Sequence, residues 1–297
     1  MDNRTINRNQ PAVKQVLRLL ALLVVWATMV WAGADGRTEK TFDTTREPRI
    51  SLTNLKGQVL VRAWPKPQVH IVYTIASPQV EVDTEVLPDT GAAEKIHFTT
   101  HLLDPALVGD AQSADYTLDV PAGASLQIRN LQGSARVVGI QADASIDSVG
   151  GNIVVSDYSG HLSVRSVGGD IEITHPSGQV DAYTITGNLH FVSPATTRLR
   201  GSTTSGNILY EGDFMERGDY YLSAYSGNVD VICPASASYE LSATTKRGKV
   251  INTLAINRRR QPARPGEAES LLGTHNTGKA TVQLQSFSGN IRIRPQD

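Results

Sequence analysis

The sequence predicts an all-β protein, a β-solenoid of the parallel β-helix type, and three observations carry this prediction. A glycine followed by a polar and then an aliphatic residue recurs at intervals of 18 to 21 residues after Gly133. Between these glycines apolar and polar residues alternate, as in strands buried on one face. Beyond the N-terminal segment no stretch keeps the i, i+3, i+4 apolar spacing of a helix. Without helices to cover a sheet, successive repeats are expected to stack and bury one another.

Residues 1–34 predict an export signal. Basic residues dominate the first 18 positions, the apolar run Leu19 to Trp31 carries no charge, and Ala32, Gly33 and Ala34 are small. This order is typical of a secretory signal peptide, and the uncharged run is shorter than the roughly 20 residues of a spanning helix. We expect cleavage after Ala34 and a mature protein that is periplasmic, cell-surface or secreted. An uncleaved membrane anchor is the alternative, because a bilayer can thin around a short helix.

Residues 35–125 predict a less regular β region that precedes or caps the repeats. Strand-like runs occur at 50–64 and 69–75. The segment Asn54-Leu55-Lys56-Gly57 resembles Asn130-Leu131-Gln132-Gly133, so the same turn chemistry is expected in both parts of the chain.

Residues 126–297 predict the solenoid itself. Minor glycines such as Gly160 divide the repeat into steps of nine, so each repeat of about 18 to 21 residues has two strand-plus-turn legs. Stacking in register would place the aliphatic residue of each repeat in one interior column: Ile153, Ile171, Leu189, Ile208, Val229 and Val250. A long antiparallel meander or sandwich is the alternative, since nine-residue units can also form hairpins.

Polar residues accompany the repeat glycines at fixed offsets. Ser or Thr lies three positions before most of them, and Asn or Asp usually follows. These side chains are expected to hydrogen-bond the turning backbone, and stacked Asn residues are expected to form partial ladders.

One long insertion interrupts the last repeat. Residues 257–277 are predicted to be a solvated loop, and they contain Arg258, Arg259 and Arg260. The functional alternative is a basic finger for anionic glycans or lipid headgroups, because adjacent arginines raise the local potential.

The chain resembles a bacterial family known as putative adhesins. The resemblance rests on the opening from Asn54 to Trp64, the passage from Tyr116 to Ser125 through Val120-Pro121, and the repeated Ser/Thr-x-x-Gly-Asn/Asp-Ile/Val units. It covers most of residues 45–295 and implies a β-helical surface or envelope protein. No catalytic residues come with it.

Catalytic, metal and cofactor sites find no support in the sequence. No acid-base pair or zinc-binding spacing recurs on one face, and no glycine-rich phosphate loop precedes a helix. A net charge of −1 argues against a dedicated nucleic-acid binder. The single cysteine, Cys233, excludes an intramolecular disulfide and is expected to be a buried thiol.

The expected function is therefore binding. Tyr158, Tyr183 and Tyr225 are candidates for stacking on a glycan, although rings at solenoid corners also serve to cover the core. We expect a non-enzymatic protein that binds glycan, envelope polymer or a surface protein, with no nucleic acid, and with membrane contact only through an uncleaved N-terminal segment. The alternatives are a carbohydrate-active β-helix enzyme and an envelope scaffold or stress-sensing module.

Overall fold

The computed structural model describes residues 36–259 and 268–296. The predicted export signal and Arg260 lie outside the described residues. In the described part of the chain, no helix is long and apolar enough to cross a membrane.

The predicted all-β class is confirmed, because the described residues form β-strands and one short 3-10 helix, η1 (Gly109–Gln112). The strands are β1 (Arg37–Lys56), β2 (Val59–Trp64), β3 (Gln68–Ile75), β4 (Val80–Leu87), β5 (Ala93–Leu102), β6 (Ala114–Pro121), β7 (Ser125–Gln132), β8 (Ala135–Val138), β9 (Ala144–Gly150), β10 (Ile153–Ser156), β11 (Ser159–Gly168), β12 (Ile171–Thr174), β13 (Ser177–Thr186), β14 (Leu189–Val192), β15 (Ala195–Ser205), β16 (Ile208–Glu211), β17 (Asp219–Ser226), β18 (Val229–Cys233), β19 (Tyr239–Arg247), β20 (Val250–Asn252), β21 (Asn257–Arg258), β22 (Glu269–His275), β23 (Ala280–Ser288) and β24 (Ile291–Pro295).

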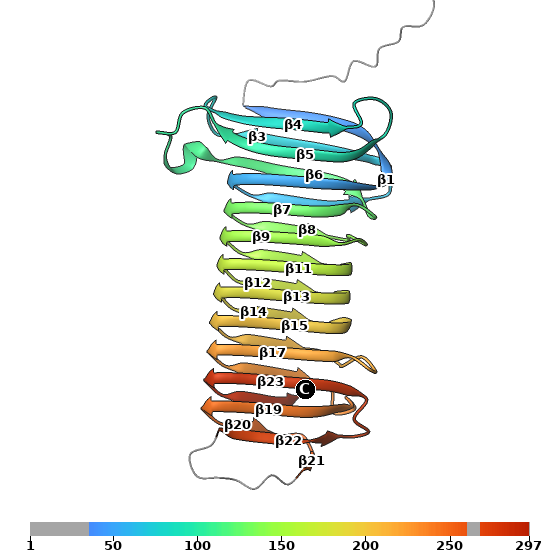
Figure 1. Cartoon of the computed structure of the whole chain (residues 1–297), viewed down its shortest axis with the longest axis vertical. Coiled ribbons are helices and arrows are strands. Elements are labelled where there is room, and N and C mark those ends of the chain that lie inside the picture. Colours follow the sequence, from blue (N-terminus) through green and yellow to red (C-terminus); the bar gives the residue numbers. More distant parts are fainter. Residues whose placement is uncertain (1–35, 260–267, 297) are drawn as a thin grey trace, which may run out of the picture.

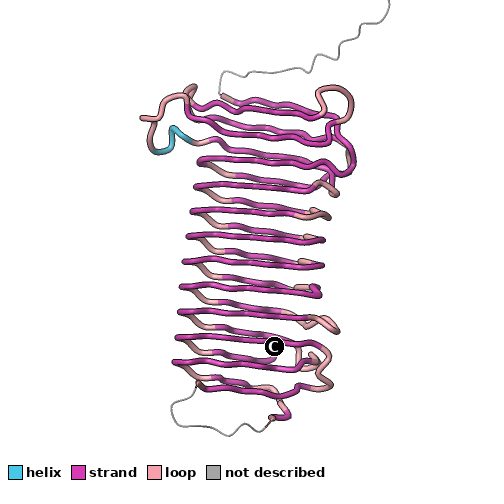
Figure 2. Tube along the Cα trace, in the orientation of Figure 1, coloured by secondary structure: helices cyan, strands magenta, loops and turns pink. Residues whose placement is uncertain are grey.

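The strands pair in two long ladders, called sheet A and sheet B here, which run along the length of the molecule (Figures 1 and 2). In the middle of the molecule, each coil of the chain gives one strand to each sheet. Sheet A stacks β8, β10, β12, β14, β16 and β18, and sheet B stacks β7, β9, β11, β13, β15 and β17.

Neighbouring repeats pair in parallel and in register. Ile153 lies opposite Ile171, Ile171 opposite Leu189, and Leu189 opposite Ile208. All of these side chains are buried. This confirms the predicted interior column from Ile153 to Val229. The predicted last member, Val250, is half-buried and does not lie beside Val229. The alternative of an antiparallel meander is wrong for the repeats.

The order of the coils in space differs from their order in the chain at both ends. At the C-terminal end β23 lies between β17 and β19, and β24 lies between β18 and β20. Consequently Ile291 separates Val229 from Val250 in the interior column. At the other end, β1 lies between β5 and β7, and β2 between β6 and β8. The region 35–125 therefore contributes two coils to the stack.

Antiparallel strands cover most edges of this stack. At the N-terminal end β3 and the first part of β1 extend sheet A, and β4 extends sheet B. At the C-terminal end β22 pairs with β19, and β21 pairs with β22. The prediction of a loop over residues 257–277 is thus wrong in part, since β21 and β22 both lie within it. Such cover protects unpaired edge strands from joining other chains.

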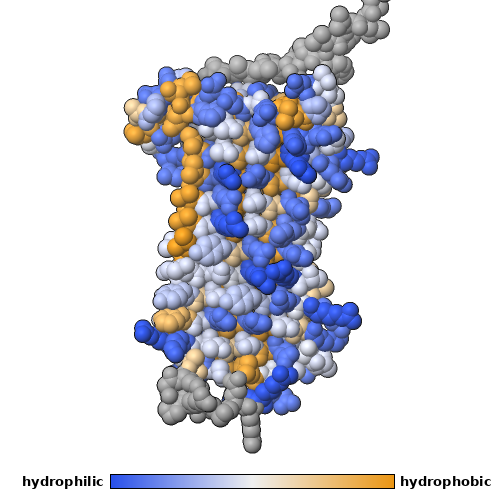
Figure 3. Space-filling model, viewed as in Figure 1, coloured by the Kyte–Doolittle hydropathy of each residue, from blue (hydrophilic) through white to orange (hydrophobic). Residues whose placement is uncertain are grey.

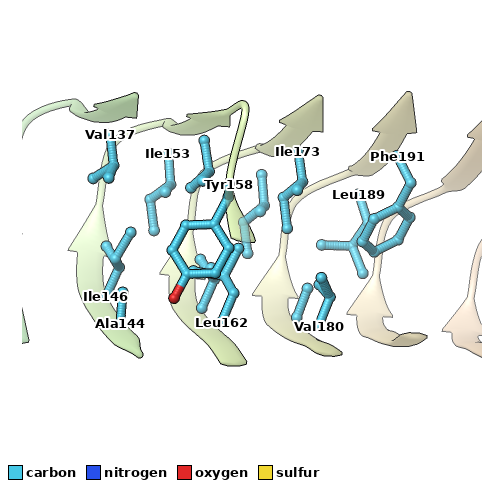
Figure 4. Close-up of a cluster of buried hydrophobic side chains, with 14 of the residues drawn as sticks. Val137, Ala144, Ile146, Ile153, Tyr158, Leu162, Ile173, Val180, Leu189 and Phe191 are labelled. Atoms are coloured by element: carbon cyan, nitrogen blue, oxygen red, sulfur yellow. The ribbon is translucent and has the colours of Figure 1, made fainter. Parts of the chain in front are cut away.

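The interior is mainly aliphatic, as the scarcity of aromatic residues predicts. Figure 4 shows Ile153, Ile173 and Leu189 of sheet A facing Leu162 and Val180 of sheet B. Toward the C-terminal end the core changes to a cluster of aromatic rings, with centroids 4.8 to 5.8 Å apart: Tyr210, Phe214, Tyr220 and Tyr239.

The repeat glycines stack directly on one another, and this contact explains why the position is glycine. A Cβ atom placed on Gly187 would overlap the carbonyl oxygen of Gly169, although the φ of Gly187 does not lie in the left-handed region that favours glycine. The requirement here is therefore the close approach of two backbones between coils.

The polar residues around each glycine hold adjacent coils together, as expected. The Asn188 side-chain oxygen accepts a hydrogen bond from the Asn207 backbone N–H at 2.9 Å, and Asn207 does the same for Asn228 at 2.9 Å. On the other side of the turn, the buried Thr203 hydroxyl donates to the Gly187 carbonyl oxygen at 3.0 Å. Each coil thus satisfies polar backbone groups of its neighbour.

Candidate functional site

The outer face of sheet B carries rows of side chains that run along the stack. In each strand alternate residues point outward, and parallel register places equivalent residues in columns. Two adjacent columns on β7, β9, β11 and β13 stand out. The charged column consists of Arg129, Asp147, Arg165 and Tyr183, and the apolar column consists of Leu131, Val149, Val167 and Ile185.

The apolar column is exposed to solvent along its whole length. Its four side chains are 41%, 49%, 46% and 37% exposed in chain order. The column forms the orange stripe along the left edge of the stack in Figure 3. A continuous row of large aliphatic side chains is a marker of an interaction surface, unlike single exposed apolar residues.

Two shallow grooves follow these columns. A groove of about 420 Å³ is lined by both columns and by the buried Asn130, Ser148 and Ser166 at its base. A second groove of about 410 Å³ shares Arg165 and Tyr183 with the first and continues to Arg200 and Tyr221 over the small residues 201–202. The face is therefore hollowed along the stack where small residues lie beneath the larger ones.

Charges in the charged column are only loosely paired within the chain. The closest approach between Arg129 and Asp147 is 4.0 Å, and both side chains reach solvent. Arg165 lies beside Asp147 and Tyr183 in the register, yet among the described residues it forms no ion pair within 4.0 Å. The face thus offers an unpaired guanidinium beside a carboxylate and an aromatic ring.

The three tyrosines predicted as stacking faces lie in different environments. Tyr158 is buried, and its hydroxyl donates to the carbonyl oxygens of Ala142 and His161. Burial raises the pKa of this phenol well above its usual range. Tyr158 therefore covers the core at a corner, and its ring has no free face for a ligand.

Tyr183 and Tyr225 are both exposed on sheet B. Tyr183 lines both grooves. Tyr225 is 58% exposed and stacks in parallel on Phe287, with ring centroids 4.8 Å apart. This pair depends on the changed coil order, because β23 lies directly beside β17. Tyr225 and Phe287 occupy the same outward position as the apolar column, further along the stack.

The predicted basic cluster lies at the C-terminal cap, apart from the tyrosines. Arg258 belongs to the short strand β21, and Arg259 follows it. The Nη2 atom of Arg259 lies 2.6 Å from the Oε1 atom of Glu240, and both side chains are exposed. Sheet B places β23, β17 and β15 between this cap and Tyr183 on β13, so the structure does not bring the two groups of candidates together.

Potential metal ligands form no cluster in the described part of the chain. No three His, Cys, Asp or Glu side chains there are placed to hold a metal ion. Several histidines instead pair with carboxylates, as His161 does with Asp181 at 3.1 Å. Cys233 is buried, and burial raises the pKa of its thiol to about 11.

The apolar column is the part of this face that was not predicted from the sequence. Its signal is present, because an aliphatic residue lies two positions before each of four successive repeat glycines. Alternation alone assigns that position to the outside, where an aliphatic residue is unexpected.

No family model matches the chain, and no curated protein matches it either. Among solved structures, a putative cell adhesion protein from Clostridium sporogenes is similar, with a TM-score of 0.28 and 10% identity over 88% of this chain and 100% of that one. A putative adhesin from Parabacteroides merdae is similar with a TM-score of 0.30 and 10% identity, over 89% of this chain and 98% of that one. The functional proposals below therefore rest on the side chains of this chain.

Proposed function

We propose that the protein is an exported, non-enzymatic β-solenoid of the bacterial envelope or cell surface that binds another protein through the outer face of sheet B. The exposed apolar column is the observation that carries this proposal. Four aliphatic side chains in a row, flanked by charged groups, have the composition of a protein interface with an apolar centre and a polar rim.

A protein ligand fits this face better than a glycan. Sugars bind most readily to flat aromatic rings, whereas the column between Leu131 and Ile185 is aliphatic. Tyr183 is the single ring lining the groove formed by the two columns. The resemblance of the sequence to adhesins agrees with a binding role, and function is argued here from the surface and not from the fold.

Export is tested by sequencing the N-terminus of the protein recovered from the envelope of a producing bacterium. We expect a mature chain that begins at Asp35. A chain that still begins near Met1 and resists carbonate extraction would show a membrane anchor instead.

Binding is tested by attachment of bacteria that produce the full chain, to each other and to cells that lack it. The double variant Val149→Asp with Val167→Asp places charges in the apolar column and is expected to abolish attachment. The control is Ile251→Asp, which changes an exposed aliphatic residue on sheet A. Equal attachment by the double variant and the parent would overturn the proposal. In a separate assay of the purified protein, release of fragments from a polysaccharide would favour the enzyme alternative.

A further inference from the structure

The charged column is complementary in charge to a second copy of the same column that runs in the opposite direction. Along the stack it reads Arg129, Asp147, Arg165, Tyr183, with one residue for each coil. Consider a second copy related to the first by a two-fold axis that is parallel to the strands and lies midway between β9 and β11. The two outer faces then meet with their stacks antiparallel, and each column faces the same column of the second copy. Asp147 of the first copy then meets Arg165 of the second copy, and Arg165 of the first copy meets Asp147 of the second copy.

The outer members of the column match in the same arrangement. Arg129 meets Tyr183 of the second copy, and a guanidinium on an aromatic ring is a favourable cation–π contact. Each of these contacts occurs twice, because a two-fold interface repeats every pair. A parallel arrangement of the two copies would instead place Arg165 against Arg165.

The apolar column matches as well. Val149 meets Val167 of the second copy, and Leu131 meets Ile185, so aliphatic side chains lie against aliphatic side chains of similar size. Further along the strands, the half-buried Ser145 and Ser163 face each other and leave room for close approach. The same reversal brings Asp143 opposite His161, whose ring lies 3.1 Å from Asp181 of its own chain.

We propose that the protein pairs with a second copy of itself through these two columns, with the two stacks antiparallel. This proposal rests on the proposed function, since it identifies the partner of the same face. The charge complementarity of the columns carries it. Arg165, which forms no ion pair within its own chain among the described residues, gains a carboxylate partner in the pair.

The test uses two charge-reversal variants. Each is expected to weaken self-association when it is alone, and a mixture of the two is expected to restore association. In Arg165→Glu, two like-charged contacts with Asp147 replace two ion pairs, and Asp147→Arg has the corresponding effect. We expect each variant alone to self-associate at least roughly tenfold more weakly than the parent. A mixture of the two variants should form a heterodimer of near-parental affinity, because each reversed charge then meets its opposite.

Sedimentation velocity of the full chain, purified from a host that exports it, measures these affinities, with one variant carrying a dye to reveal mixed pairs. The control is Glu172→Lys, a charge reversal on the outer face of sheet A in the same part of the stack, which should leave self-association unchanged. Circular dichroism confirms that each variant is folded.

A parent that stays monomeric at all concentrations would overturn self-pairing, and so would a mixture no tighter than the single variants. These failures differ from failure of the proposed function. If producing cells still attach to cells that lack the protein, and Val149→Asp with Val167→Asp abolishes this, the face binds a different protein and only the self-pairing falls.

Discussion

At the scale of single residues, the stacked glycines limit which side chains each coil accepts. The contact between Gly187 and Gly169 joins two backbones at a separation that no Cβ atom permits. Gly168, which precedes Gly169 in the same turn, is less restricted, because the atom nearest to its Cβ position lies 3.4 Å away. Neighbouring glycines in one turn are therefore expected to differ in their tolerance of substitution.

We predict that Gly187→Ala lowers the free energy of unfolding by about 3 kcal/mol, because the coils must separate to admit the methyl group. Gly168→Ala is the matched control, since the nearest atom to its Cβ would be the Thr186 hydroxyl oxygen at an ordinary 3.4 Å. Urea denaturation of both variants measures the difference. Equal losses would show that backbone entropy of glycine, and not contact between coils, determines the effect.

Cys233 gives a second prediction at this scale. Its thiol is buried with a pKa near 11, so at pH 8 it holds roughly 100-fold less thiolate than an ordinary cysteine. Alkylation by iodoacetamide, followed by mass spectrometry, should be at least that much slower in the folded protein than in urea.

The raised pKa of the Cys233 thiol also makes the free energy of unfolding depend on pH. The unfolded chain releases the thiol proton near pH 9 and the folded chain near pH 11, so this contribution to stability is complete below pH 9 and is lost as the pH rises between these values. Fast alkylation of the native protein at pH 8 would contradict the burial of Cys233.

At the scale of elements, the interior column makes each short strand of sheet A depend on its neighbours. Ile171 on β12 is buried between Ile153 and Leu189, while Glu172 beside it points to solvent. A strand of four residues has little stability of its own, so packing between coils must hold it.

We predict that Ile171→Asp prevents cooperative folding, because it buries a carboxylate with no partner in an aliphatic column. Glu172→Gln, at the adjacent outward position, should melt within a few degrees of the parent. Thermal melting followed by circular dichroism compares them. If Ile171→Asp melts like the parent, the register of sheet A is wrong.

The sequence predicts those features of the strands that depend on the spacing of neighbouring residues, but not the order of the coils in space. The strands, their parallel register and the Asn ladder follow from spacing, because Ile153 and Ile171 occupy equivalent positions in successive repeats. The position of β24 between β18 and β20 does not follow from spacing. Val229, Val250 and Ile291 have the same local sequence pattern, so any two of them could be neighbours.

The candidate residues on the outer face of sheet B show the same division. Tyr183 and Tyr225 were predicted to be candidates, and both are exposed. Tyr158 has a similar sequence environment but lies at an inward corner, which alternation does not reveal. The apolar column escaped prediction because an aliphatic residue in a strand is normally assigned to the core.

At the scale of the whole molecule, the stack behaves as a one-dimensional array in which each coil contacts its two neighbours. From β8 to β14 the sheet A strands repeat every 18 residues and place buried apolar side chains at equivalent positions. Antiparallel strands cover both sheets at the N-terminal end and sheet B at the C-terminal end. The number of middle coils is thus independent of the caps.

We predict that deletion of residues 154–171 yields a folded protein shorter by one coil, because Ile153 then precedes Glu172 in the same register. Small-angle X-ray scattering should show a stack shorter by about 4.8 Å, the spacing between strands. Deletion of residues 154–162 removes one leg instead and moves all later strands to the opposite sheet, so it should not fold. Folding of the nine-residue deletion would show that the two sheets are interchangeable.

The changed coil order at the C-terminal end also constrains how the molecule is completed during synthesis. Coils from β7 to β18 can dock one after another as they leave the ribosome, since each finds its neighbour already in place. β19 cannot, because the strand that lies between it and β17 is β23, which is made later. β19 and β20 therefore lack their neighbours in the stack until β23 and β24 have been made. The stack grows in one direction through its middle, but its final layers form together, so a stalled or truncated chain leaves an open, adhesive edge.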